Sequence, residues 1–79
     1  MNLLKTLRFQ RQLSQDEIAR LVGADQSRIS RLERDLLRDT PATLALRRRV
    51  AGALGVPIDA IFPRLKILPE EEGPNGARE

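Results

Sequence analysis

The chain has 79 residues, which is the size of one small domain. It carries 14 Lys and Arg residues against 11 Asp and Glu residues, for a formal net charge of +3 at pH 7. The sequence contains no His, Cys, Trp or Tyr, which excludes histidine acid–base catalysis, thiol nucleophiles, zinc sites built from His or Cys, and disulfide bonds.

The apolar segments are too short to anchor the chain in a membrane. The longest stretch without a charged residue, 50–58, has nine residues, whereas a membrane-spanning helix needs about 20. The N-terminal residues lack the long apolar run and the cleavage site of a signal peptide. The absence of cysteine also fits a reducing compartment. We therefore expect a soluble, cytoplasmic protein.

The charge is unevenly distributed along the chain. Residues 1–69 hold 13 basic and 7 acidic side chains, whereas residues 70–79 hold one basic and four acidic side chains. The last segment is rich in Gly, Pro and Glu and has too few apolar residues to fold, so we expect a disordered acidic tail over 70–79. Residues 1–63 are predicted to form the folded domain and 64–69 a short C-terminal extension. The basic body favours a polyanion as partner.

Apolar residues near the start of the chain recur with the period of an amphipathic helix. They are Leu3, Leu4 and Leu7, with charged residues between and after them, and the pattern ends near Gln12. The sequence therefore predicts a first helix over 3–12.

A second helix begins at a capping box. The Ser14 hydroxyl is placed to accept a hydrogen bond from the backbone N–H of Glu17, and the Glu17 carboxylate is placed to accept one from the N–H of Ser14. Leu13 and Ile18 flank the box at the spacing of a hydrophobic staple. These residues predict a helix start at Ser14.

The second helix is short and leads through a tight turn into a third. Gly23 is expected to end it in a left-handed conformation, and Asp25 is expected to cap the next helix, which buries Ile29 and Leu32. A glycine-containing turn of this length makes two short helices cross steeply, as in a helix-turn-helix. The buried face of the second helix is predicted to consist of Ile18, Ala19 and Val22.

Thr40 and Pro41 predict the start of a fourth helix, which runs to about Leu54 and ends at Gly55. A short fifth helix fits 56–62. The segment 64–68 is compatible with a short strand, a helical turn or an extended arm. The fourth helix is expected to bury Leu46, Val50, Ala53 and Leu54. The fifth is expected to gather Ile58, Ile61 and Phe62 on one side.

The chain resembles the phage-repressor/Cro family, also called XRE-type. The resemblance covers about residues 3–62 and is carried by the capping box at 14–17, the turn glycine Gly23, the polar third helix ending in Glu33 and Arg34, and the run 50–62. It implies an all-α fold: a compact five-helix, lambda-repressor-like DNA-binding domain whose second and third helices form the helix-turn-helix.

The outer side of the third helix is polar and basic, because burial of Ile29 and Leu32 leaves Ser27, Arg31 and Arg34 on the opposite face. Arg pairs with guanine and Gln with adenine in the major groove of DNA. The resemblance implies that the N-terminal residues of this helix reach base edges. The alternative is that they are ordinary polar residues of a first helical turn. The predicted base contacts are Gln26, Ser27, Arg31 and Arg28.

Other polar residues are expected to contact the DNA backbone. In repressors similar to this chain, a glutamine at the start of the first motif helix meets a phosphate and braces a second glutamine, and here Gln15 and Gln26 match those positions. The unpaired N–H groups at the start of the second helix offer a further phosphate site. The predicted phosphate contacts are Gln15, Arg11, Arg34 and Arg38.

Two charged residues border the expected core. Arg8 follows Leu4 by four residues and Glu33 follows Ile29 by four, and two such charges are tolerable there only if they pair. The resemblance implies a partly buried ion pair between Arg8 and Glu33 across the first and third helices. We interpret this pair as structural.

Some features are open to two interpretations or depart from the family pattern. The run 47–49, three arginines, is either a nucleic-acid patch or a solvated helix face, and Glu70–Glu72 either compete with DNA for the basic face or are simply solvated. The loop after the third helix is longer than usual and contains Leu36 and Leu37, which pack under the fourth helix or contact a second copy. Pro57 replaces the Ser-like cap that usually opens the fifth helix.

The favoured function is a sequence-specific DNA-binding transcriptional regulator, specifically a repressor, whose third helix reads an operator through the major groove as a homodimer. The alternative is an antitoxin or adaptor that uses the helical domain to bind protein. RNA binding ranks third because aromatic stacking residues are scarce, and no enzyme activity, cofactor or metal is expected. The predicted dimer interface is Ile58, Ile61, Phe62, Leu65 and Ile67.

Overall fold

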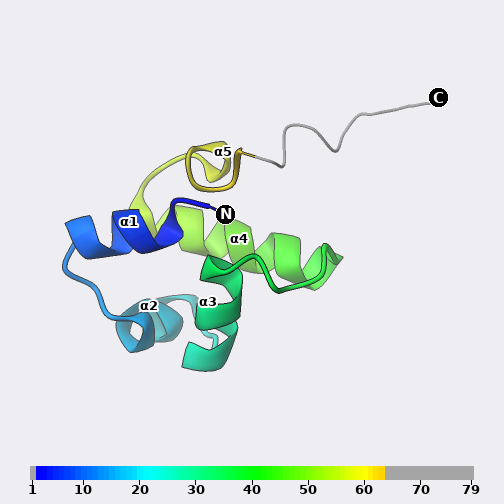
Figure 1. Ribbon diagram of the computed structural model, residues 1–79, viewed down its shortest axis with the longest axis horizontal. Helices are drawn as coiled ribbons and strands as arrows, with labels where there is room; N and C mark the ends of the chain where they lie inside the picture. Colours follow the sequence, from blue (N-terminus) through cyan, green and yellow to red (C-terminus); the bar gives the residue numbers. More distant parts are fainter. Residues whose placement is uncertain (1, 64–79) are drawn as a thin grey trace.

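The computed structural model describes residues 2–63, which contain five α-helices and no strand (Figure 1). The expected all-α, five-helix architecture is confirmed. None of the described helices is long and apolar enough to cross a membrane. The predicted extension and acidic tail, including Leu65 and Ile67, lie outside the described residues. The helices are α1 (Leu4–Gln10), α2 (Gln15–Val22), α3 (Gln26–Glu33), α4 (Pro41–Leu54) and α5 (Ile58–Ile61).

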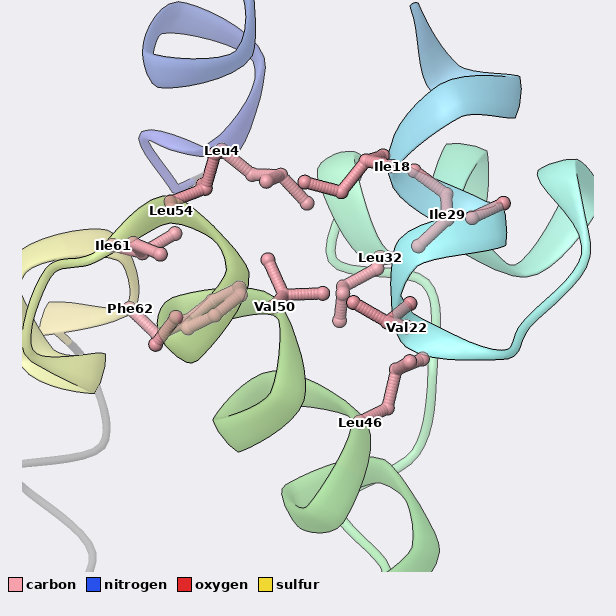
Figure 2. Packing of buried hydrophobic residues seen from close by; sticks show 12 residues of the cluster. Leu4, Ile18, Val22, Ile29, Leu32, Leu46, Val50, Leu54, Ile61 and Phe62 are labelled. Carbon is pink, nitrogen blue, oxygen red and sulfur yellow. The ribbon is translucent and has the colours of Figure 1, made fainter. Parts of the chain in front are cut away.

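A single apolar core joins all five helices. In Figure 2 the side chains of Leu4, Ile18, Leu32 and Val50 point from four different helices into a common interior. Because the helices are short, each stays ordered chiefly by burying one face against the others. The core consists of Leu4, Ile18, Ala19, Val22, Ile29, Leu32, Leu46, Val50, Ala51, Leu54, Ile61 and Phe62.

The starts and ends of α2 and α3 follow the local signals in the sequence. Both hydrogen bonds of the capping box are present: Ser14 Oγ accepts from the Glu17 N–H at 3.0 Å, and Glu17 Oε1 accepts from the Ser14 N–H at 2.8 Å. Gly23 ends α2 with φ +71°, and Asp25 Oδ1 accepts from the Arg28 N–H at 2.7 Å. The predicted helix-turn-helix boundaries are thereby confirmed.

Helix α4 also begins and ends where the sequence predicts. Thr40 Oγ1 accepts a hydrogen bond from the Thr43 N–H at 3.1 Å, Pro41 occupies the first turn, and Gly55 caps the end with φ +70°. The prediction of its buried face is wrong at one residue: Ala53 is exposed and Ala51 is buried in its place. The buried face of α4 extends toward the side that carries Thr43, Arg47 and Ala51, which recur every four residues.

Two connecting segments differ from their expected form. Helix α1 ends at Gln10, and Gln12 then takes a positive φ of 57° on the way to α2. In the loop between α3 and α4, Leu37 packs against the core, whereas Leu36 is exposed. The packing role expected of the two loop leucines therefore applies to Leu37 alone.

The capping box predicts a stability change that depends on pH. Hydrogen bonds from the backbone and side chain of Ser14 lower the pKa of the Glu17 carboxyl below its ordinary value. A carboxyl whose pKa is lowered by folding stabilises the protein above the ordinary pKa, and this contribution is lost as the pH falls through the folded-state pKa. We expect Ser14→Ala to lower the free energy of unfolding at pH 7 by about 1 kcal/mol.

The pH dependence provides the check. Chemical denaturation of Ser14→Ala and wild type, repeated from pH 7 down to pH 3, should show the difference in unfolding free energy shrinking as Glu17 becomes protonated, to the part contributed by the hydrogen bond from the Glu17 N–H to Ser14 Oγ. Glu17→Gln, which keeps a hydrogen-bonding side chain but no charge, should show less change with pH than wild type over the same range. If the difference in unfolding free energy between Ser14→Ala and wild type stays constant down to pH 3, the Glu17 charge makes no contribution to it and the loss comes from the Ser14 hydroxyl alone.

Candidate nucleic-acid interface

Helices α2 and α3 lie next to each other on one side of the molecule, with α1 and α4 on the other side (Figure 1). The turn between them spans 23–25, so α3 begins only four residues after the end of α2. Burial of Ile29 and Leu32 against the core fixes which side of α3 faces outward. The two helices therefore form a packed pair with one surface of α3 exposed.

The free surface of α3 carries the residues that the sequence predicts to meet bases. Gln26, Ser27 and Arg31 are exposed, and Arg28 is partly buried at the edge of the same surface. The first turn of α3 contains no acidic residue, and Asp25 before it is engaged in capping. This surface presents amide, hydroxyl and guanidinium groups without an interspersed carboxylate, which suits the acceptor-rich edges of base pairs.

The two glutamines that open α2 and α3 touch each other. Gln26 Nε2 donates a hydrogen bond to Gln15 Oε1 at 3.3 Å. Gln26 is exposed and Gln15 is half-buried, so the contact holds the outer side chain against a more anchored one. The structure therefore brings these two predicted site residues together as the resemblance implied.

Arg8 and Glu33 form a buried ion pair between α1 and α3. Arg8 Nε donates to Glu33 Oε2 at 2.6 Å and Arg8 Nη2 donates to Glu33 Oε1 at 3.4 Å, while Arg8 Nη1 donates to the Leu13 carbonyl at 2.8 Å. Their side chains are only 7% and 6% exposed, so solvent does not screen the pair. The ion pair ties the end of α3 to α1 and to the segment that leads into α2.

Sequence reasoning missed a contact between this ion pair and the interface. Gln15 Nε2 donates a hydrogen bond to Glu33 Oε1 at 3.1 Å, across a separation of 18 residues. The sequence placed Gln15 at the first position of α2 and Glu33 at the end of α3, but their distance depends on how the two helices cross. The ion pair and the glutamine pair are thus one connected set of side chains.

The arginines predicted to contact phosphates come from different parts of the fold. Arg34 is held against its own helix, with Nε donating to the Ser30 carbonyl at 3.3 Å and Nη2 donating to Ser30 Oγ at 3.2 Å. Arg11 follows α1 and Arg38 lies in the loop before α4, and both are exposed. Of the three arginines, Arg34 is the one for which a hydrogen bond to α3 fixes the guanidinium.

The three arginines of the run 47–49 in α4 differ in exposure: Arg47 is buried, whereas Arg48 and Arg49 are exposed. Arg47 is buried, with Nη2 2.8 Å from Asp39 Oδ1 and its guanidinium over the ring of Phe62. Arg49 Nε donates to the Val22 carbonyl at the end of α2 at 2.8 Å. Arg48, between them, is exposed. Two of the three arginines therefore hold α4 to neighbouring parts of the fold.

The structure changes the surface that was expected to form a dimer. Ile61 is fully buried, Phe62 is buried beside it, and Ile58 packs against the same core while half-buried. Side chains in this position serve the core of one chain and are not available to a second copy without rearrangement. The other two residues predicted for this interface lie beyond the described residues.

Comparison with known proteins agrees with the geometry. A family model described as Helix-turn-helix matches residues 4–61, which run from the first residue of α1 to the last residue of α5. No curated protein matches the chain. The match includes the capped α2, the glycine turn and the polar α3 described above. The chain therefore belongs to the XRE-type helix-turn-helix family of DNA-binding transcriptional regulators.

Proposed function

We propose that this protein is a sequence-specific transcriptional repressor that reads double-stranded DNA by placing α3 in the major groove. The observation that carries the proposal is the free surface of α3, on which Gln26, Ser27 and Arg31 are exposed together while its other side is fixed in the core. The major groove of B-DNA is wide enough to admit an α-helix. In it, Arg31 has the donors to pair with guanine, and Gln26 the amide to pair with adenine.

Contacts to the DNA backbone would set the position of α3. The N-terminal N–H groups of α2 favour an anion, and Gln15 lies at the first position of that helix. Arg34 uses two of its five N–H donors on Ser30, which leaves three for a phosphate. Arg11 and Arg38 supply further positive charge. In this proposal phosphate contacts orient the protein, and base contacts select the sequence.

We further propose that two copies bind a two-fold symmetric operator and repress by occupying it. A single helix of eight residues meets only a few base pairs, so two half-sites about 34 Å apart would supply the missing specificity. Because Ile61 and Phe62 are buried, the contact between the copies must use other residues, with the partly buried Ile58 at its margin. Sedimentation of the protein with and without a two-half-site duplex measures this stoichiometry.

The salt dependence of DNA binding tests the proposed function. If Arg11, Arg34 and Arg38 of each copy meet phosphates, a bound dimer neutralises about six, and log K should fall with log [salt] with a slope of about −5. Arg11→Gln should make this slope shallower by about one unit for each copy. Fluorescence anisotropy with a labelled duplex from 50 to 300 mM salt measures both slopes.

Failure to bind any duplex at low salt, together with tight binding to a co-encoded protein, would contradict the proposal and favour the antitoxin or adaptor function. Arg48→Gln provides a matched control, because it removes an exposed arginine from α4 and not from the α2–α3 side of the molecule. It should leave the slope unchanged.

A further inference from the structure

We infer that Glu33 is a positioning residue for base recognition: acting through Gln15, it sets the direction of the Gln26 amide and so makes Gln26 a reader of adenine. The inference rests on the proposed function. It depends on a continuous series of hydrogen bonds from the buried Arg8–Glu33 pair to the exposed end of α3, which we call the amide relay.

The direction of the amide relay is set at its buried end. Arg8 offers only donors, and it is anchored by a third hydrogen bond to the Leu13 carbonyl. The Glu33 carboxylate therefore accepts from Arg8, and it also accepts from Gln15 Nε2 at 3.1 Å. Neither oxygen of a carboxylate can donate in return. Gln15 must consequently turn its NH2 group inward.

This constraint passes outward through Gln15 to Gln26. With its NH2 group on Glu33, Gln15 presents its carbonyl Oε1 to Gln26, and Oε1 accepts from Gln26 Nε2 at 3.3 Å. A glutamine amide can by itself adopt either of two orientations, because its oxygen and its NH2 group are similar in size and differ in that one accepts and the other donates hydrogen bonds. Here the buried ion pair selects one orientation of the Gln26 amide, although Gln26 itself is exposed.

The hydrogen-bonding groups that remain on Gln26 match adenine. One N–H of Nε2 is used on Gln15, which leaves one N–H donor and the carbonyl Oε1 acceptor. Adenine presents an acceptor at N7 and a donor at N6 in the major groove, whereas guanine presents acceptors at both N7 and O6. A Gln26 held in this direction can satisfy both groups of adenine, but it would oppose its carbonyl to guanine O6.

Reversing the amide relay should reverse this preference. In Glu33→Gln, the new amide can accept from Arg8 with its oxygen and donate to Gln15 with its NH2 group. Gln15 then turns over and donates to Gln26 Oε1, which leaves two N–H donors on Gln26, the pattern that fits guanine. Wild type should bind the duplex with adenine at this base pair about 5- to 150-fold more tightly than the duplex with guanine. In Glu33→Gln this ratio of affinities should fall to about one or below.

The measurement is competition binding with four duplexes that differ only at the base pair met by Gln26. This ratio compares sequences for the same folded protein, so a loss of stability alone does not move it. Val50→Ala is the matched control, since it removes buried core volume on α4, which contributes no residue to the relay, and it should retain the adenine preference. Gln15→Leu interrupts the relay but leaves Arg8 paired with Glu33, and its ratio should fall to within about twofold of one.

The outcomes separate this inference from the proposed function. If wild type selects no sequence at all, the proposed function fails and the inference fails with it. If wild type prefers adenine and both Glu33→Gln and Gln15→Leu keep that preference in full, DNA reading stands and the positioning role of Glu33 is overturned. If Glu33→Gln does not fold, the base preference of Gln15→Leu alone tests the inference, because this substitution leaves the Arg8–Glu33 ion pair in place.

Discussion

Arg8→Met is expected to lower the free energy of unfolding by about 3–5 kcal/mol, because it breaks a buried ion pair from one side only. The substitution leaves the Glu33 carboxylate without its cationic partner at a site where it is almost fully shielded from water. It also removes the hydrogen bond to the Leu13 carbonyl. A small domain has a total stability of about 5–15 kcal/mol, so the loss should be obvious in urea denaturation followed by circular dichroism.

Two controls show whether burial of the charge is the cause. In Arg8→Met with Glu33→Leu, both charges are replaced by apolar groups, and stability should return to within about 1–2 kcal/mol of wild type. Arg20→Met breaks the Arg20–Asp16 ion pair. Arg20 Nη2 lies only 2.7 Å from Asp16 Oδ2, but the two side chains are 79% and 52% exposed. This substitution should cost about 0.5 kcal/mol or less. Equal losses in Arg8→Met and Arg20→Met would contradict this explanation.

Arg31→Ala is expected to weaken binding to the preferred duplex by about 1–3 kcal/mol and to remove discrimination at one base pair of each half-site. Arg31 is exposed on α3 and lies outside the apolar core, so stability should change little. The expected loss comes from a bidentate contact with a guanine edge, which no other base reproduces. Anisotropy titrations with the preferred duplex and its single-base variants measure the loss.

Arg34→Ala serves as the comparison. Arg34 directly follows the same helix, but its guanidinium is bonded to Ser30 and is assigned to a phosphate. Its replacement should weaken binding to all duplexes by about the same factor, without changing which base is preferred. If the two variants behave alike across the set of duplexes, then α3 contributes charge and not base recognition.

The helix boundaries could be predicted because their causes are local. Ser14 and Glu17 are three residues apart, and Gly23 and Gly55 end helices through their own backbone conformation, so a short stretch of sequence contains all the necessary information. The buried faces of α2 and α3 follow from helical period alone. The pairing of Arg8 with Glu33 followed from the family resemblance.

The contacts that the sequence did not reveal are those between distant segments. Gln15 meets Glu33 across 18 residues and Arg49 meets the Val22 carbonyl across 27, and both distances depend on how the helices cross. Arg47 is buried because it is paired with Asp39, and exposed Arg49 is bonded to the Val22 carbonyl. Helical period does not indicate either partner, because both lie outside α4. In the same way, helical period places the apolar residues Ile61 and Phe62 on one side of the helix, but it does not show whether the core of the same chain or a second copy buries them.

The most direct test of the central claim is binding-site selection from random duplex DNA with the wild-type protein. If α3 reads base edges in the major groove, the selected sequences should share a two-fold symmetric consensus with half-site centres about 10 base pairs apart. Adenine should be fixed at the position met by Gln26, and guanine at the position met by Arg31. Recovery of unrelated sequences, with no base enriched at any position, would contradict the claim that α3 reads bases.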